Sequence, residues 1–125
     1  MPDETEWNDL LSAVGGKDVA GTKLKSASGW EMNGNGDDTF GFSALPAGYK
    51  QAPECPPPAG SSASHVSYCL YDWDYFGYDY AASFGCSTEH DSEETYYLFL
   101  SMHDGYAQLR SDVKLFGFSV RCIKD

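Results

Sequence analysis

At 125 residues the chain has the length of one domain, long enough to bury a core without outside support. Its 8 Lys and Arg stand against 19 Asp and Glu, which gives a formal net charge of −11. A surface this acidic repels a phosphate backbone and an anionic membrane, which argues against nucleic acid as a partner. No apolar run approaches the length of a membrane span, which argues against membrane insertion.

The first predicted element is a helix over residues 3–14. Asp3 is a good N-cap, and Glu6 three residues later completes a capping-box pair. The apolar residues recur at helical spacing and form one stripe, made of Trp7, Leu10, Leu11 and Val14. A second, shorter helix is predicted over residues 19–26, with Asp18 as its cap.

A polar cluster, NGNGDD, occupies residues 33–38 and is typical of a turn. Its carboxylate and amide oxygens are also of the kind that calcium prefers. An EF-hand loop, however, needs Gly at its sixth position and Glu at its twelfth, where this chain has Asp38 and Ala44. The pattern therefore favours a structural turn, with a calcium site as the alternative.

The middle of the chain alternates between regular and irregular patterns. Residues 40–45 alternate in the manner of a strand, and residues 46–64 are rich in Pro, Gly and Ser, which predicts an irregular surface loop. Residues 68–80, YCLYDWDYFGYDY, interleave aromatic residues with Asp and fit either a strand or an exposed loop. Such aromatics are costly to leave in water without a purpose.

The C-terminal third predicts three strands, over residues 96–100, 106–110 and 116–123. The last of them alternates with a period of two, the mark of a strand with one buried face. The predicted core contains Trp30, Phe42, Phe118 and Val120. Truncating such a core aromatic, as in Phe118→Ala, is expected to cost about 3–5 kcal/mol.

The four cysteines are Cys55, Cys69, Cys86 and Cys122. Their spacing fits no zinc pattern, because no two of them form a C-x-x-C pair. Cys55 and Cys69 flank a Pro- and Ser-rich loop, so we predict a disulfide between them. For Cys86 and Cys122 a cross-strand bridge and two reduced thiols both remain open.

Several stretches occur in the order known from one protein family. They are Glu6-Trp7, Gly15-Gly16, AGTKLKS at 20–26, Gly29-Trp30, NGNG at 33–36, FGFSALPAGY at 40–49, STE at 87–89, Tyr96-Tyr97 and GFSVRC at 117–122. On these motifs the chain resembles the Fibrobacter succinogenes major paralogous domain over nearly its whole length, apart from about residues 51–83. The resemblance implies a C-type-lectin-like α+β fold, related to that of formylglycine-generating enzymes. It also implies an extracellular, cell-surface or virion-surface location in bacteria or their phages.

The chain departs from the family pattern in three regions, one of which is residues 84–89, FGCSTE, where WWSSTE-like motifs are usual. The strand segment that usually precedes the first helix is missing, so we expect a single domain over residues 1–125 that lacks this N-terminal strand. Residues 51–83 form an inserted or variable loop region that carries Cys55 and Cys69. The expected fold is two N-terminal helices followed by a small antiparallel sheet with long irregular loops.

Some C-type-lectin-like proteins are the variable proteins of diversity-generating retroelements, and the C-terminal region of this chain is similar to theirs. Aromatic and polar residues lie where such proteins display a variable surface on a fixed scaffold. The predicted ligand-binding face consists of Tyr71, Trp73, Tyr75, Tyr78, Phe99, Met102, His103, Asp104, Gln108 and Arg110. Rigid aromatic side chains with adaptable polar neighbours are typical of paratopes, so the expected partner is a protein or cell-surface receptor.

The sequence also allows two alternatives to this function. The first is a carbohydrate-binding module, with or without calcium dependence, in which Trp73 or Tyr75 stacks on sugar rings. The second is an enzyme, which we do not expect, because His65, His90 and His103 belong to no recognisable catalytic motif. The acidic run over residues 89–94 is read as a solvated face, with a metal ion or cationic partner as the alternative. No cofactor is expected beyond the calcium alternative.

Overall fold

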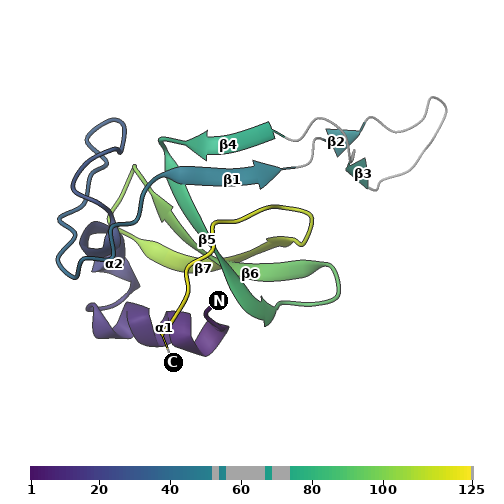
Figure 1. The fold of residues 1–125 in the computed structure, drawn as a ribbon, viewed down its shortest axis with the longest axis horizontal. Coiled ribbons are helices and arrows are strands. Elements are labelled where there is room, and N and C mark those ends of the chain that lie inside the picture. The colour runs from purple at the N-terminus through teal and green to yellow at the C-terminus, as the bar shows by residue number, and fades with distance from the viewer. Residues whose placement is uncertain (52–53, 56–66, 69–73, 125) are drawn as a thin grey trace.

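The computed structural model describes residues 1–51, 54–55, 67–68 and 74–124, and in these ranges it is an α+β domain with a curled mixed sheet (Figure 1). The two helices are α1 (Glu4–Ala13) and α2 (Lys17–Leu24). The five strands of the sheet are β1 (Ala47–Gln51), β4 (Asp74–Tyr78), β5 (Ala81–Glu89), β6 (Glu94–Ser101) and β7 (Ala107–Val113). A separate pair is formed by β2 (Glu54–Cys55) and β3 (Ser67–Tyr68).

The first helix confirms the prediction from its capping residues. The Asp3 side chain accepts a hydrogen bond from the Glu6 backbone at 2.8 Å, and the Glu6 carboxylate accepts one from the Asp3 backbone at 2.9 Å. Trp7 and Leu11 of the predicted stripe are buried. The second helix begins earlier than predicted, at Lys17, because Gly16 and not Asp18 occupies its N-cap position.

The sheet is mixed, which corrects the prediction of an antiparallel one. Its order is β4-β1-β5-β6-β7; β5, β6 and β7 pair antiparallel in sequence, while β1 pairs with β5 in parallel at Gly48 and Ala82. β1 follows α2 through the 25–46 segment, and β4, which comes immediately before β5 in the chain, pairs antiparallel with β1. β4 and the start of β5 fall within residues 51–83, the region predicted as an inserted loop.

Residues 116–123 do not form the predicted strand. β1 and β5 diverge beyond their single parallel contact, and the C-terminal segment enters the space between them. Gly117 exchanges two backbone hydrogen bonds with Lys50 of β1, at 2.7 and 2.8 Å. Ser119 bonds to Ser83 and Gly85 of β5, at 2.9 and 2.8 Å. Each side contributes an isolated bridge rather than a ladder.

Residues 40–45 also do not form the predicted strand. The backbone takes positive φ at Asp38 (50°), Gly41 (67°) and Ser43 (54°), and such left-handed residues interrupt an extended chain. The Asp38 carboxylate fixes this turn by accepting hydrogen bonds from the Ser43 backbone (2.7 Å) and hydroxyl (2.5 Å). Only Ala44 makes a strand-like bridge, to Lys25.

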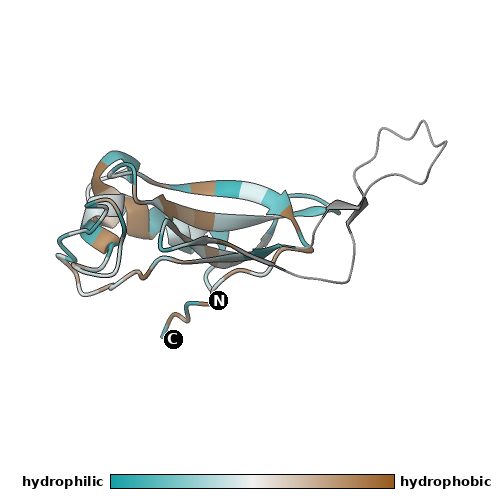
Figure 2. Ribbon diagram, turned by 90° about the horizontal axis from the view of Figure 1, so that it is seen from above, coloured by the Kyte–Doolittle hydropathy of each residue, from teal (hydrophilic) through white to brown (hydrophobic). Residues whose placement is uncertain are grey.

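The core lies between the helices and the inner face of β5, β6 and β7. Hydrophobic and hydrophilic stretches alternate along the strands (Figure 2). Leu98, Leu100 and Ala107 are fully buried, and Trp7 packs against the rings of Phe42 and Phe84. The Trp7 indole also donates a hydrogen bond to the carbonyl of Gly85 at 3.3 Å.

The predicted core residues differ in how deeply the structure buries them. Trp30 is buried, and Phe42 is half-buried against the core cluster. Phe118 is half-buried and stacks on Tyr97 on the other face of the sheet, so it lies outside that cluster. Val120 is 66% exposed, so its prediction as core was wrong. Its segment contacts the sheet through backbone hydrogen bonds and the rings of Phe116 and Phe118, which leaves Val120 outside.

The structure describes the side chains of two of the four cysteines. Cys86 is a buried free thiol and Cys122 an exposed one, so the two are not bridged to each other. Cys69 lies outside the described residues, and for Cys55 the structure describes the strand alone. The disulfide between Cys55 and Cys69 therefore stays a prediction.

The close approach of α2 to the turn between β6 and β7 predicts that a side chain at Gly21 destabilises the fold. A Cβ atom added at Gly21 would overlap the carbonyl oxygens of Tyr106 and Gly105. Gly→Ala inside a helix ordinarily stabilises by about 1 kcal/mol, whereas overpacking costs about 1–3 kcal/mol. We expect Gly21→Ala to lower the free energy of unfolding by at least about 1 kcal/mol in urea denaturation.

The matched control is Ser12→Ala, an exposed position of α1. This change should alter the free energy of unfolding by less than about 0.5 kcal/mol. A Gly21→Ala protein as stable as the parent would show that α2 does not lie this close to the 105–106 turn.

Candidate functional site

The outward face of β6 and β7 carries a row of large polar and aromatic side chains. The register pairs Tyr97 with Arg110 and Phe99 with Gln108, so these four lie on one face, opposite the buried Leu98 and Leu100. Phe99 is half-buried and Arg110 is exposed. The same two strands therefore supply the core on one side and a polar-aromatic surface on the other.

Arg110 is held in place by its two neighbours. Its guanidinium lies over the Phe99 ring, 3.9 Å from the ring centroid. In the amide orientation that satisfies both groups, the Gln108 oxygen accepts hydrogen bonds from Nη2 (2.7 Å) and Nε (3.0 Å) of Arg110. Stacking below and hydrogen bonding at one edge fix the orientation of the guanidinium plane.

These side chains form the wall of a pocket of about 250 Å³, which we call the β6–β7 pocket. It is lined by Phe99, Ser101, Asp104, Tyr106, Gln108 and Arg110. Ser101 ends β6 and Tyr106 precedes β7, so the pocket lies over the turn that joins the two strands. Tyr106 is 49% exposed, at the rim of the surface.

Lys25 supports this turn from the inside of the molecule. Its side chain is only 3% exposed, and its Nζ donates hydrogen bonds of 2.9 Å to the carbonyls of Ser101 and Asp104. The ammonium also lies over the Trp30 ring, 5.1 Å from its centroid. Burial lowers the pKa of Lys25 from its ordinary value, and the negative charge of Asp104 partly opposes that shift.

Further aromatic contacts extend the surface beyond the pocket. Phe118 of the C-terminal segment stacks on Tyr97, with ring centroids 4.5 Å apart and an angle of 10° between planes. Tyr49 of β1 stacks on both Phe116 (5.8 Å) and Phe76 (6.2 Å). Burial raises the pKa of Tyr97, with the charge of Asp112 acting in the same direction.

The structure brings together only part of the predicted site. Phe99, Asp104, Gln108 and Arg110 share the β6–β7 pocket, and His103 is exposed in the same turn. Met102 is 8% exposed and belongs to the core cluster, so its place on an exposed face was wrong. The turn after β6 directs Met102 inward, where it covers Gly34.

The remaining predicted residues lie elsewhere or are not described. Tyr78 is 65% exposed but lines a different pocket, beside Leu45 and Pro46. Tyr71 and Trp73 lie outside the described residues, and for Tyr75 the structure describes the strand alone. The prediction missed Ser101 and Tyr106, although alternation from Phe99 and Gln108 along the strands points to both.

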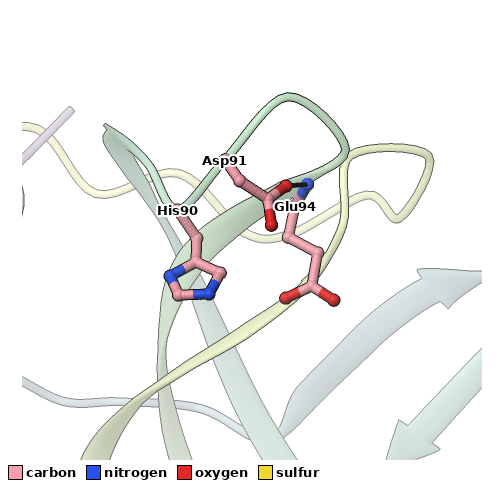
Figure 3. A group of neighbouring side chains, drawn as sticks. All are labelled: His90, Asp91 and Glu94. Atoms are coloured by element: carbon pink, nitrogen blue, oxygen red, sulfur yellow. Dashed lines mark hydrogen bonds between the residues drawn. The ribbon is translucent and has the colours of Figure 1, made fainter.

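The acidic run forms the tight turn between β5 and β6, where His90, Asp91 and Glu94 gather (Figure 3). The ligand-type atoms of these three side chains lie within 4.8 Å of one another. Local hydrogen bonds account for the arrangement: Asp91 Oδ1 accepts from the backbones of Glu93 and Glu94 at 2.8 Å, and His90 Nδ1 lies 2.8 Å from the Tyr96 hydroxyl. His90 and Asp91 are exposed, as expected for a solvated face.

The cluster at residues 33–38 lies in an irregular segment that begins with a tight turn, in which the Gly34 N–H donates to the Glu31 carbonyl at 2.8 Å. The Asn35 side chain accepts a hydrogen bond from the Trp30 backbone at 2.9 Å. Asp37 accepts from the Thr39 hydroxyl, and Asp38 is engaged by Ser43. These oxygens already serve the local fold, and a calcium site there stays a prediction.

No protein-family model, curated protein or solved structure matches the chain. Within the described ranges, no helix combines the length and the apolar character needed to cross a membrane.

Replacement of Lys25 tests the support beneath the pocket. Lys25→Met would leave two inward-facing carbonyls without their donor, and an unsatisfied buried polar group costs about 1–3 kcal/mol. We expect the free energy of unfolding to fall by about 2 kcal/mol or more. The control is Lys23→Met, whose half-buried ammonium donates to the Val14 carbonyl at 2.8 Å, near water. Equal losses for both variants would contradict a special role for Lys25.

Asp38 gives a prediction about acid stability. Hydrogen bonds from the Ser43 hydroxyl, and then from its backbone N–H, hold the pKa of Asp38 below its ordinary value. A carboxyl with a lowered folded-state pKa contributes stability above its unfolded pKa, and that stability is lost as pH falls through the folded pKa. The melting temperature should therefore fall below about pH 4, and it should fall less steeply in Asp38→Asn.

Asp9→Asn is the control, because it removes the same charge from an exposed position of α1. Its melting temperature should follow the acid slope of the parent. An Asp38→Asn protein with the slope of the parent would mean that the turn at residues 38–43 opens without cost.

Proposed function

We propose that this domain is a non-catalytic ligand-recognition module of C-type-lectin-like fold, exposed outside the cell or on a virion. The binding surface is the β6–β7 pocket with the adjoining aromatic rings. The partner is a protein or cell-surface receptor, as in the variable proteins of diversity-generating retroelements. The two N-terminal helices packed on a curled sheet are consistent with this fold.

One observation supports the proposal most directly. Phe99, Ser101 and Gln108 alternate along β6 and β7 with buried residues, so the surface can change without disturbing the core. Leu98, Leu100 and Ala107 are 0% exposed. Their neighbours Phe99 and Gln108 point to the other face. A fixed frame that displays exchangeable side chains is the arrangement that variable binding proteins need.

A carbohydrate-binding module is the second candidate function. It is favoured by the exposed Tyr106 ring at the rim of a pocket that also holds Asp104, Ser101 and Gln108. An aromatic ring can stack on a sugar, while carboxylate, hydroxyl and amide groups bond its hydroxyls. The two candidates use the same pocket and differ in the partner.

The test is binding of the labelled domain to arrays of immobilised surface proteins and glycans. Phe99→Ser and Tyr106→Ser should abolish binding while the melting temperature changes by no more than about 4 °C. Val120→Ser, which alters an exposed apolar residue away from the pocket, should bind like the parent. Unchanged binding of both pocket variants would refute the proposed surface. Binding confined to glycans would favour the second candidate, and its loss with a chelator would show that calcium is needed.

A further inference from the structure

Arg110 is a positively charged group without a carboxylate partner in the described part of the chain. In these described residues the ion pair joins Lys114, which follows β7, to Glu89, which ends β5, at 3.1 Å. Asp and Glu outnumber Lys and Arg by 19 to 8, so leaving an arginine unpaired is not forced by composition. Arg110 instead rests on an aromatic ring and lines a pocket.

The guanidinium retains hydrogen-bonding capacity that the protein does not use. It has five N–H donors, of which Gln108 accepts two. The Tyr97 hydroxyl lies near the same guanidinium. Donors that Gln108 does not use therefore remain, on a guanidinium whose plane is fixed by Phe99 and Gln108. An oriented guanidinium with free donors is suited to a carboxylate or a phosphate, because both accept paired hydrogen bonds.

The other side chains that line the pocket restrict which anion can bind there. Asp104 brings a carboxylate to the same pocket, and the whole chain is strongly acidic. A doubly charged phosphate would be repelled more strongly than a singly charged carboxylate. Asp104 and the Ser101 hydroxyl would in turn accept hydrogen bonds from donors next to that carboxylate, such as an amide N–H or sugar hydroxyls.

We propose that the β6–β7 pocket binds a single carboxylate group of the ligand through Arg110. This inference rests on the proposed function, because it names the chemical group that the recognition surface takes. The carboxylate can come from the side chain of Glu in a protein partner or from a sugar acid. In both cases the neighbouring hydrogen-bond donors face Asp104 and Ser101.

The experiment follows the Arg Nε–H signals of the ¹⁵N-labelled domain by NMR at low salt. The probes are N-acetyl-glutamic acid α-amide, glucuronate, glucose and inorganic phosphate. Arg121 is an internal control, because its guanidinium also stacks on a phenylalanine, 4.5 Å from the Phe42 centroid, but does not line the pocket. The Arg110 signal is assigned from the spectrum of Arg110→Lys.

We expect saturable shifts at Arg110 with one or both carboxylates, dissociation constants in the millimolar range that a single ion contact gives, and no comparable shift at Arg121. Arg110→Ala should weaken binding, observed at neighbouring backbone amides, by at least fivefold, and Arg121→Ala should leave it unchanged. Tighter binding of the glutamate probe would identify a protein as the source of the carboxylate. Tighter binding of glucuronate would identify a sugar acid.

Three results would each overturn the inference: no saturable shift at Arg110, phosphate or glucose binding as tightly as the carboxylates, or carboxylate binding that survives Arg110→Ala. Such a result leaves the proposed function standing if Phe99→Ser still abolishes array binding. If array binding survives in the pocket variants, the recognition surface itself is wrong, whatever the carboxylates do.

Discussion

A buried ammonium group organises this domain. Lys25 ends α2, and its Nζ reaches two carbonyls of the turn between β6 and β7 while lying over Trp30. Removing a charge from water costs several kcal/mol, and only well-placed acceptors offset that cost. The Lys25 side chain therefore specifies the relative positions of helix, turn and Trp30, because any displacement leaves the charge without its acceptors.

The backbone around Lys25 reinforces this arrangement. Leu24 and Ser26, on either side of it, exchange hydrogen bonds with Ala44 at 2.9 and 3.0 Å, and Gly36 donates to the Ser26 carbonyl at 2.9 Å. An irregular segment over residues 27–46 is thus held at several points to the end of one helix. The β6–β7 pocket inherits its geometry from this contact, since Ser101 and Asp104 line the pocket and also bind Lys25.

Local sequence signals were sufficient for the elements whose stabilisation is local. The capping pair of Asp3 and Glu6 and the Trp7 stripe predict α1, and the short strand-like runs at 96–100 and 106–110 predict β6 and β7. The segments 40–45 and 116–123 alternate with a period of two without becoming strands. The first is turned by left-handed residues and the Asp38–Ser43 bonds, and the second finds only single-residue contacts on each side. Both outcomes depend on partners remote in sequence, which a period of two does not reveal.

The same distinction explains what could be foreseen of the site. Phe99, Gln108 and Arg110 were predicted from the resemblance to variable proteins, and the strand register places all three on one face. Met102 was misplaced because it follows the end of β6, where alternation no longer applies and the turn points it into the core. The Lys25 contact could not be foreseen, since a lysine on a short polar helix is ordinarily exposed.

The two faces of β6 and β7 have different roles, one in stability and the other in the proposed recognition. The inner face contributes Leu98 and Leu100 to the core, and the outer face contributes Phe99 and Arg110 to the pocket. Substitutions on the outer face change contacts that are half in water, so their cost in folding free energy is small. The turn between the strands does not share this freedom, because Lys25 needs its carbonyls in place. Those contacts use the backbone of residues 101 and 104, however, and not their side chains. Exchanging Ser101 or Asp104 would therefore keep these two backbone acceptors, but it would remove side-chain hydrogen bonds to the backbone N–H groups of His103 and Tyr106 and, at position 104, a negative charge that favours the charged form of Lys25.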